Sequence, residues 1–192
     1  FVRTLKNRFG PTDEVGCFEM TGEGIVEVKD PSALFVSNST TPVSGTCITV
    51  AVEGRRALRA EIQALVVQSG TPQPRRVTNG VDSSRVAMLL AVLERRAGIS
   101  LSNKDVYVST VGGMKIIEPA ADLAIAIAIA SAASDKPVST TIAAFGEISL
   151  SGEIRGVANL NQRINEAARL GHKVVIDSTA GQLKKALAEA LG

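Results

Sequence analysis

The sequence predicts an α/β domain with a mixed sheet. Candidate strands fill most of the first half, whereas strands alternate with helices through the second half, an order typical of this class. The chain has 192 residues, of which 45% are hydrophobic, and is therefore large enough to bury a substantial core. Only 3% are aromatic and none is Trp, so Ala, Val, Ile and Leu must build that core. Base-stacking surfaces are not expected.

The first half is expected to consist of a connector followed by strands. Residues 1–14 are polar and contain a Gly-Pro break, so we predict a connector there and one domain over 15–192. Residues 15–28 alternate in the manner of a hairpin that turns around 21–24, and Asp30 with Pro31 predicts a short helical turn. The β-branched and alternating runs predict further strands over residues 46–52, 60–67 and 75–78, with a turn at 53–54 between the first two.

Two helices are expected next, with a strand between them. The first starts at Asp82 and ends before Gly98, because apolar residues recur at helical spacing between them. Residues 105–110 predict a strand, and Gly112 with Gly113 a turn. The segment 118–134 is ambiguous, since isoleucines alternate with alanines at strand period. Its length and Pro119 favour a helix that is buried nearly all round.

The last third alternates short strands and amphipathic helices. A capping box of Asn159 and Gln162 predicts a helix that ends at Gly171, and Thr179 with Gln182 predicts another box before the final helix. Strands are expected over residues 141–145 and 173–176, with a hairpin over 146–154.

Cysteine and histidine content argues against a metal site. Cys17, Cys47 and the single histidine, His172, cannot form the usual four-ligand zinc site without carboxylates. We therefore expect buried free thiols, no metal, and His172 on the surface. The net charge of +2 indicates no particular partner, although arginines cluster in pairs that could contact phosphates.

Several catalytic motifs are missing. The chain contains no G-x-x-x-x-G-K-[ST] loop and no G-x-S-x-G elbow. A serine with a lysine base remains a possible catalytic pair, because a desolvated lysine can accept the hydroxyl proton. Ser109 or Ser131 with Lys115 are the candidates for such a peptidase, and the turn into the helix at 118 is the natural place for an oxyanion site.

From about residue 81 to residue 191, the order of elements resembles the proteolytic domain of Lon proteases, whose nucleophile lies in a Gly-Pro-Ser-Ala-Gly motif. This chain reads Glu118-Pro119-Ala120-Ala121-Asp122 instead, so Ala120 occupies the serine position and both glycines are acids. The family's lysine position is occupied by Asn161. The resemblance therefore implies a Lon-like domain, similar to domain 2 of ribosomal protein S5, without catalytic residues, because an amide is no general base near neutral pH.

Further motifs resemble the bacterial DNA repair family RadA, also called Sms. They occur in one order and cover essentially the whole chain: Lys6-Asn7-Arg8-Phe9-Gly10, residues 14–20 and 61–65, 111–113, 118–122, and Gly146-Glu147-Ile148. In that family a zinc finger and an ATPase core precede the K-N-R-F-G motif. The resemblance implies a scaffold and DNA-binding domain of a hexameric, DNA-dependent ATPase that promotes branch migration in homologous recombination.

The resemblance also implies sites and partners. Lys6 and Arg8 would bind either DNA phosphate or a neighbouring subunit's nucleotide, since both cations suit phosphate. Further DNA-binding candidates are Arg55, Arg56, Arg59, Arg75, Arg76 and Arg85. The expected partners are single-stranded or branched DNA, further copies of the chain and the RecA recombinase.

ATP with magnesium, and zinc, would bind only in preceding parts of the protein. No apolar run predicts a membrane span or signal peptide, so we expect a cytoplasmic bacterial protein. The alternative is a purely structural oligomerisation or docking module.

Overall fold

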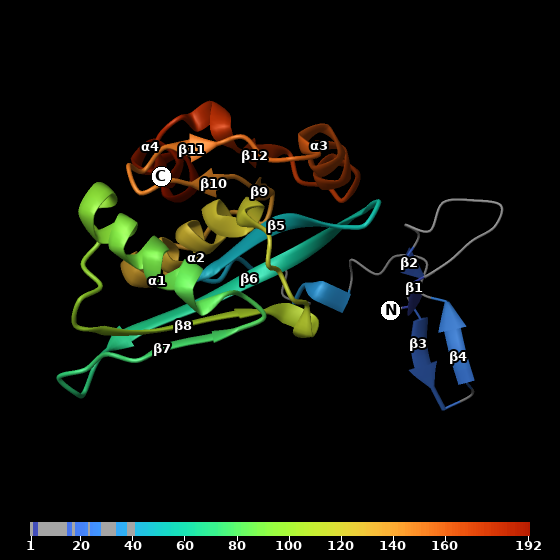
Figure 1. Ribbon diagram of the computed structural model, residues 1–192, viewed down its shortest axis with the longest axis horizontal. Coiled ribbons are helices and arrows are strands. Elements are labelled where there is room, and N and C mark those ends of the chain that lie inside the picture. The colour runs from blue at the N-terminus through green and yellow to red at the C-terminus, as the bar shows by residue number, and fades with distance from the viewer. Residues whose placement is uncertain (1, 4–14, 17, 23, 28–33, 38–40) are drawn as a thin grey trace.

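The computed structural model describes residues 2–3, 15–16, 18–22, 24–27, 34–37 and 41–192 (Figure 1). Two short N-terminal sheets pair β1 (Val2–Arg3) with β2 (Val15–Gly16), and β3 (Phe18–Thr21) with β4 (Gly24–Glu27). The second pair confirms the predicted hairpin. Lys6, Arg8, Cys17 and the predicted turn at Asp30 and Pro31 lie outside the described residues.

A six-stranded sheet forms the centre of the domain, in the order β12-β9-β5-β6-β8-β7. β5 pairs antiparallel with β6, and β6 with β8, whereas the β12–β9, β9–β5 and β8–β7 pairs are parallel. The predicted α/β class with a mixed sheet is confirmed. The strands are β5 (Thr46–Glu53), β6 (Arg56–Gln68), β7 (Arg76–Asn79), β8 (Lys104–Thr110), β9 (Ile142–Ala144) and β12 (Val174–Ile176).

Three helices cover one face of this sheet. α1 (Ser83–Val92) begins where the Asp82 carboxylate accepts a hydrogen bond from the Arg85 amide at 2.8 Å, and a π-helical turn (Leu93–Ala97) extends it. Gly98 ends this segment at φ 75°, as the sequence predicts. α2 (Asp122–Ser134) follows a 3-10 turn (Pro119–Ala121), and α4 (Leu183–Leu191) closes the chain.

α2 resolves the ambiguity in the sequence in favour of a helix. Every residue from Asp122 to Ser131 is buried, because α2 packs against β5 and β6 on one side and against α1 and α4 on others. A helix enclosed in this way needs no polar face, so its isoleucines and alanines alternate without regard to helical period.

α3 (Leu160–Arg169) lies on the opposite face of the sheet. Alternation along β5 separates two cores: Cys47 and Ala51 contact the α2 side, whereas Val50 joins Phe145 and Ala167 of α3 in a smaller cluster. A small hairpin of β10 (Glu147–Ile148) and β11 (Ile154–Arg155) follows β9, as predicted.

Three predictions about the last third were wrong. Neither capping box forms: Asn159 adopts a left-handed conformation with no side-chain cap bond, and Gln162 donates instead to the carbonyl of Arg55. Gln182 is itself the N-cap of α4, while Asp177 caps a 3-10 turn (Ser178–Ala180). His172 is buried rather than exposed, because the chain folds back after α3 and its Nδ1 contacts the Thr140 carbonyl at 3.1 Å.

Cys47 confirms the expectation of a buried free thiol. Burial raises the pKa of its thiol to about 12, so the thiolate is not populated near neutral pH.

The buried imidazole of His172 predicts a pH-dependent stability. Burial, together with the nearby Arg59 cation, lowers the pKa of His172 below its usual 6.5. Between the two pKa values the unfolded chain binds the proton and the folded chain does not. The contribution of neutral His172 to the free energy of unfolding is therefore fully present above about pH 6.5, and it is lost as the pH decreases from there through the folded pKa. Urea unfolding between pH 8 and pH 5 should therefore show a smaller loss for His172→Gln than for the wild type. Parallel curves would contradict this assignment.

Candidate functional site

The turn that enters α2 carries the residues that the sequence resemblance aligns with the Lon nucleophile motif. Ala120 lies within it and is 5% exposed, and its carbonyl accepts a hydrogen bond from the Gly146 amide at 2.8 Å. The two residues that flank it at the motif's glycine positions, Glu118 and Asp122, each bind an arginine. Their side chains fix this turn to four other parts of the fold.

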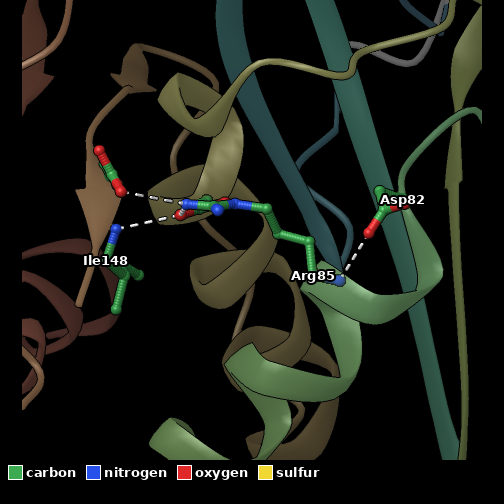
Figure 2. Close-up of polar contacts among 5 residues, drawn as sticks. Asp82, Arg85 and Ile148 are labelled. Atoms are coloured by element: carbon green, nitrogen blue, oxygen red, sulfur yellow. Dashed lines mark hydrogen bonds and ion pairs between the residues drawn. The ribbon is translucent and has the colours of Figure 1, made fainter. Parts of the chain in front are cut away.

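Asp122 ties α2 to α1 and to β10. Its carboxylate accepts hydrogen bonds from Nε of Arg85 at 2.6 Å and from the Ile148 amide at 3.0 Å, and it forms an ion pair with the guanidinium at 2.5 Å. Figure 2 shows Arg85 reaching from α1 toward the strand that carries Ile148. The Glu147 carboxylate lies 3.6 Å from the same guanidinium.

The burial of this pair is unequal. The Asp122 side chain is 1% exposed and that of Arg85 is 27% exposed. Burial raises the pKa of Asp122, while Arg85 and the Ile148 amide oppose that change by stabilising the carboxylate. Hydrogen bonding to Asp122 in turn raises the pKa of Arg85. The aspartate thus depends on its arginine to stay ionised.

Glu118 ties the same turn to α3 and β5. Arg163, whose side chain is 1% exposed, donates to both carboxylate oxygens of Glu118, at 2.9 and 2.5 Å. The guanidinium also donates to the carbonyls of Ala158 and Val50, and the Val52 amide donates to Glu118 at 3.0 Å. These acceptors compensate the positive charge of the buried Arg163 side chain beside the smaller core.

This arrangement holds neither a nucleophile nor a base at the two positions expected from the Lon motif. Ala120 offers only a methyl group, and Asn161 is exposed on the first turn of α3. The amides of Ala121 and Leu123 donate to the carbonyls of Glu118 and Gly146, so these two backbone donors are already engaged. The carboxylates of Glu118 and Asp122 are likewise held by arginines.

The alternative serine nucleophiles, Ser109 and Ser131, are not placed for catalysis with Lys115 either. Ser131 lies near the other end of α2, where its hydroxyl donates to the Lys136 carbonyl and accepts from the Gly45 amide at 2.8 Å. Ser109 is half-buried in β8, and Lys115 is exposed after the glycine turn. A desolvated lysine base is therefore not available at position 115.

Exposed cations gather at the tip of the β5–β6 hairpin instead. Arg55 and Arg56 are exposed there, and Arg59 is half-buried further along β6. Arg56 lines a groove of about 500 Å³ whose other wall is one face of α3. We define the hairpin-tip cluster as Arg55, Arg56, Gln162, Asn165 and Arg169. The same groove is also lined by Glu166, whose carboxylate pairs with Arg169.

The α3 half of this cluster was not among the predicted site residues. Gln162 was assigned to a cap, and Asn165 and Arg169 were not considered. Their spacing of three and seven residues places them on one face of a helix, which is the signal that could have identified them. Arg169 also forms an ion pair with Glu166 at 2.8 Å.

The other predicted arginines lie elsewhere. Arg75 and Arg76 are exposed at the far end of the sheet, where Arg76 donates to the carbonyls of Lys104 and Leu101. Arg76 is level with Val66 of β6, about 30 Å along the strand from Arg56 at 3.3 Å per residue. Arg75 and Arg76 therefore lie apart from the hairpin tip. Arg85 is paired with Asp122.

Two features are absent from the part of the chain that the structure describes. No cluster of three or more His, Cys, Asp or Glu side chains suited to a metal ion occurs in that part of the chain. Within the same residues, no helix combines the length and hydrophobicity that crossing a membrane requires.

The Arg85–Asp122 pair yields a double-mutant prediction. Arg85→Ala leaves a buried carboxylate uncompensated and should lower the free energy of unfolding by about 3–5 kcal/mol. Arg85→Ala with Asp122→Ala removes both charges and should recover part of that loss. Chemical denaturation of the wild type, the two single variants and the double variant measures the coupling; additive effects of the two substitutions would contradict the pairing.

Comparison with known proteins places these features in a family. The family model described as subunit ChlI of Mg-chelatase matches residues 84–180, about half of the chain, including α1, the turn into α2 and α3. Proteins named DNA repair protein RadA are 47% identical over 91% of the chain in Mycobacterium tuberculosis (strain H37Rv) and 48% identical over 88% in Streptococcus pyogenes serotype M1. The protein of that name in Rickettsia felis is 49% identical over 92%.

These matches confirm the resemblance inferred from the sequence. The chain spans only 36%, 38% and 40% of the length of the three relatives, respectively. It therefore corresponds to one part of such proteins. The chain belongs to the family described as subunit ChlI of Mg-chelatase, and over most of its length it is a relative of the bacterial proteins named DNA repair protein RadA.

Proposed function

We propose that this chain is a non-proteolytic scaffold and DNA-binding domain of a DNA-dependent ATPase that promotes branch migration in homologous recombination and DNA repair. The observation that carries the proposal is a division of charge. Glu118 and Asp122, at the turn into α2, are paired with arginines inside the fold. The hairpin-tip cluster, in contrast, presents cations at the surface. The relatives' name, DNA repair protein, supports the same role.

The hairpin-tip cluster suits a nucleic-acid backbone. Exposed Arg55 and Arg56 lie beside Gln162 and Asn165, whose amides can donate to phosphate oxygens. Few aromatic residues occur in the chain, so contacts here would follow the phosphates rather than stack on bases. Such binding is sequence-independent and salt-dependent.

The remaining parts of the proposal concern the intact protein. ATP with magnesium, and zinc, would bind in the parts of it that this chain does not include. Lys6 and Arg8 would contact either DNA or a neighbouring subunit's nucleotide in a hexamer. Single-stranded or branched DNA and RecA recombinase are the proposed partners, in the bacterial cytoplasm.

A purely structural ring or docking module is the alternative function. It would form the same assembly and leave the hairpin-tip cluster without a ligand.

The test is a salt series of single-stranded DNA binding by the intact hexameric protein. Each lost phosphate contact flattens the slope of log K against log salt by about 0.7, so Arg55→Glu with Arg56→Glu should flatten it by about 1.4. Lys184→Glu with Lys185→Glu on α4 is the matched control, because it changes two adjacent exposed cations by the same charge. An unchanged slope in the arginine variant would reject this interface, and no binding at low salt would favour the structural alternative.

The same series separates the two roles of the connector motif. If Lys6 and Arg8 contact DNA, Lys6→Ala with Arg8→Ala flattens the slope by about 1.4 as well. If they contact a neighbour's nucleotide, the slope stays unchanged and DNA-stimulated ATP hydrolysis falls.

A further inference from the structure

A second surface, far from the hairpin tip in sequence, has the features of a peptide-binding groove. It lies where α4 meets the end of α2 and the π-helical turn after α1, at the C-terminal end of the chain in Figure 1. We call it the α4 groove. Its volume is about 460 Å³, within the range of ligand-binding clefts.

The lining of the α4 groove is mainly apolar and includes several small side chains. Ala130 and Ala133 of α2 and Ala188 of α4 contribute short side chains, and Ile99, Leu187 and Leu191 surround them. Ala188 is exposed, and Ala133, Ile99 and Leu191 are half-buried. Apolar surface therefore remains open to solvent, and the short alanine side chains leave room for a larger apolar side chain from a partner.

Three lysines line the same groove. They are Lys104 at the start of β8, Lys136 after α2 and Lys184 on α4. No aspartate or glutamate is among the described residues that line it. Lys136 is anchored by a bond from its Nζ to the Gly192 carbonyl at 3.0 Å, so its charge is held beside the apolar lining.

The side chains that line the α4 groove thus combine apolar contact with one sign of charge. A partner that complements both needs carboxylates next to bulky apolar side chains. A nucleic-acid backbone would match the lysines but would leave the alanines and leucines uncovered, and none of the lining residues is aromatic. An acidic amphipathic peptide satisfies both features.

We propose that the α4 groove binds an acidic peptide segment of a partner protein, with an apolar side chain inserted among the alanines and carboxylates on the lysines. The proposal is independent of DNA binding at the hairpin tip. The two surfaces share no residue, so each can fail without the other.

The probe is a fluorescein-labelled synthetic peptide with a run of Asp and Glu followed by Leu and Phe. Fluorescence anisotropy with the full protein should show saturable binding that weakens as salt increases. Two control peptides replace either the acids by Lys or the Leu and Phe by Ala, and both should bind at least about tenfold more weakly, a change of about 1.4 kcal/mol.

Three variants locate the binding. Lys184→Glu reverses a charge in the groove, and Ala188→Trp fills it from an exposed position that does not disturb the core. Each should weaken binding about tenfold or more. Lys185→Glu is the matched control, because this neighbouring exposed lysine does not line the groove, and it should change the affinity less than about twofold.

The proposal is overturned by three results. The first is that the peptide does not bind to the wild type. The second is that the Ala188→Trp variant binds the peptide as tightly as the wild type. The third is that Lys185→Glu lowers the affinity for the peptide as much as Lys184→Glu does. A single-stranded oligonucleotide that displaces the peptide, and whose own affinity falls in Ala188→Trp, would assign the groove to nucleic acid and reject the peptide.

Discussion

The two ion pairs at the turn into α2 are the constraint on which the rest of the structure depends. Glu118 and Asp122 stand where the Lon motif has glycines, and each is held by an arginine from a different helix. Through them the turn is joined to α1, α3, β5 and β10. Since α3 lies on the opposite face of the sheet from α1, the pairs connect both cores. Removing either arginine would leave a carboxylate with too few partners in a region of low polarity.

The same pairs leave the turn into α2 without the groups that a serine–lysine peptidase centre would need there. A peptidase centre needs a nucleophile, a base and free donors for an oxyanion. Here Ala120 has no nucleophilic atom, two amides of the turn are bonded within the fold, and the charged side chains bind one another. Exposed cations at the hairpin tip and around the α4 groove suit binding rather than catalysis.

Much of this fold could be predicted from local patterns. The β-branched runs located β5 and β6, Asp82 marked the start of α1, and Pro119 with the length of the run identified α2 as a helix. The capping boxes failed because their signature is short and tertiary contacts took over, as when Gln162 bonds to Arg55 across 107 residues. His172 was misplaced because burial of a single polar residue depends on how the chain returns to the sheet.

The site was only partly predictable. That Ala120 and Asn161 stand at the positions expected for the Lon nucleophile and base could be read from the motif, but the partners of Glu118 and Asp122 could not. Arg85 and Arg163 lie 37 and 45 residues away from those acids, and no sequence spacing links them. Arg163 gave no signal of burial, since a lone arginine on an amphipathic helix is usually exposed.

The most direct test of this account restores the Lon glycines. The free energy of unfolding of Glu118→Gly with Asp122→Gly would be measured by chemical denaturation beside the wild type. If the acids hold the fold together, the loss should reach about 5 kcal/mol or more, since two arginines then lose their partners and one is fully buried. A loss near 1 kcal/mol, the ordinary cost of a glycine in a helix, would contradict the central role of these pairs.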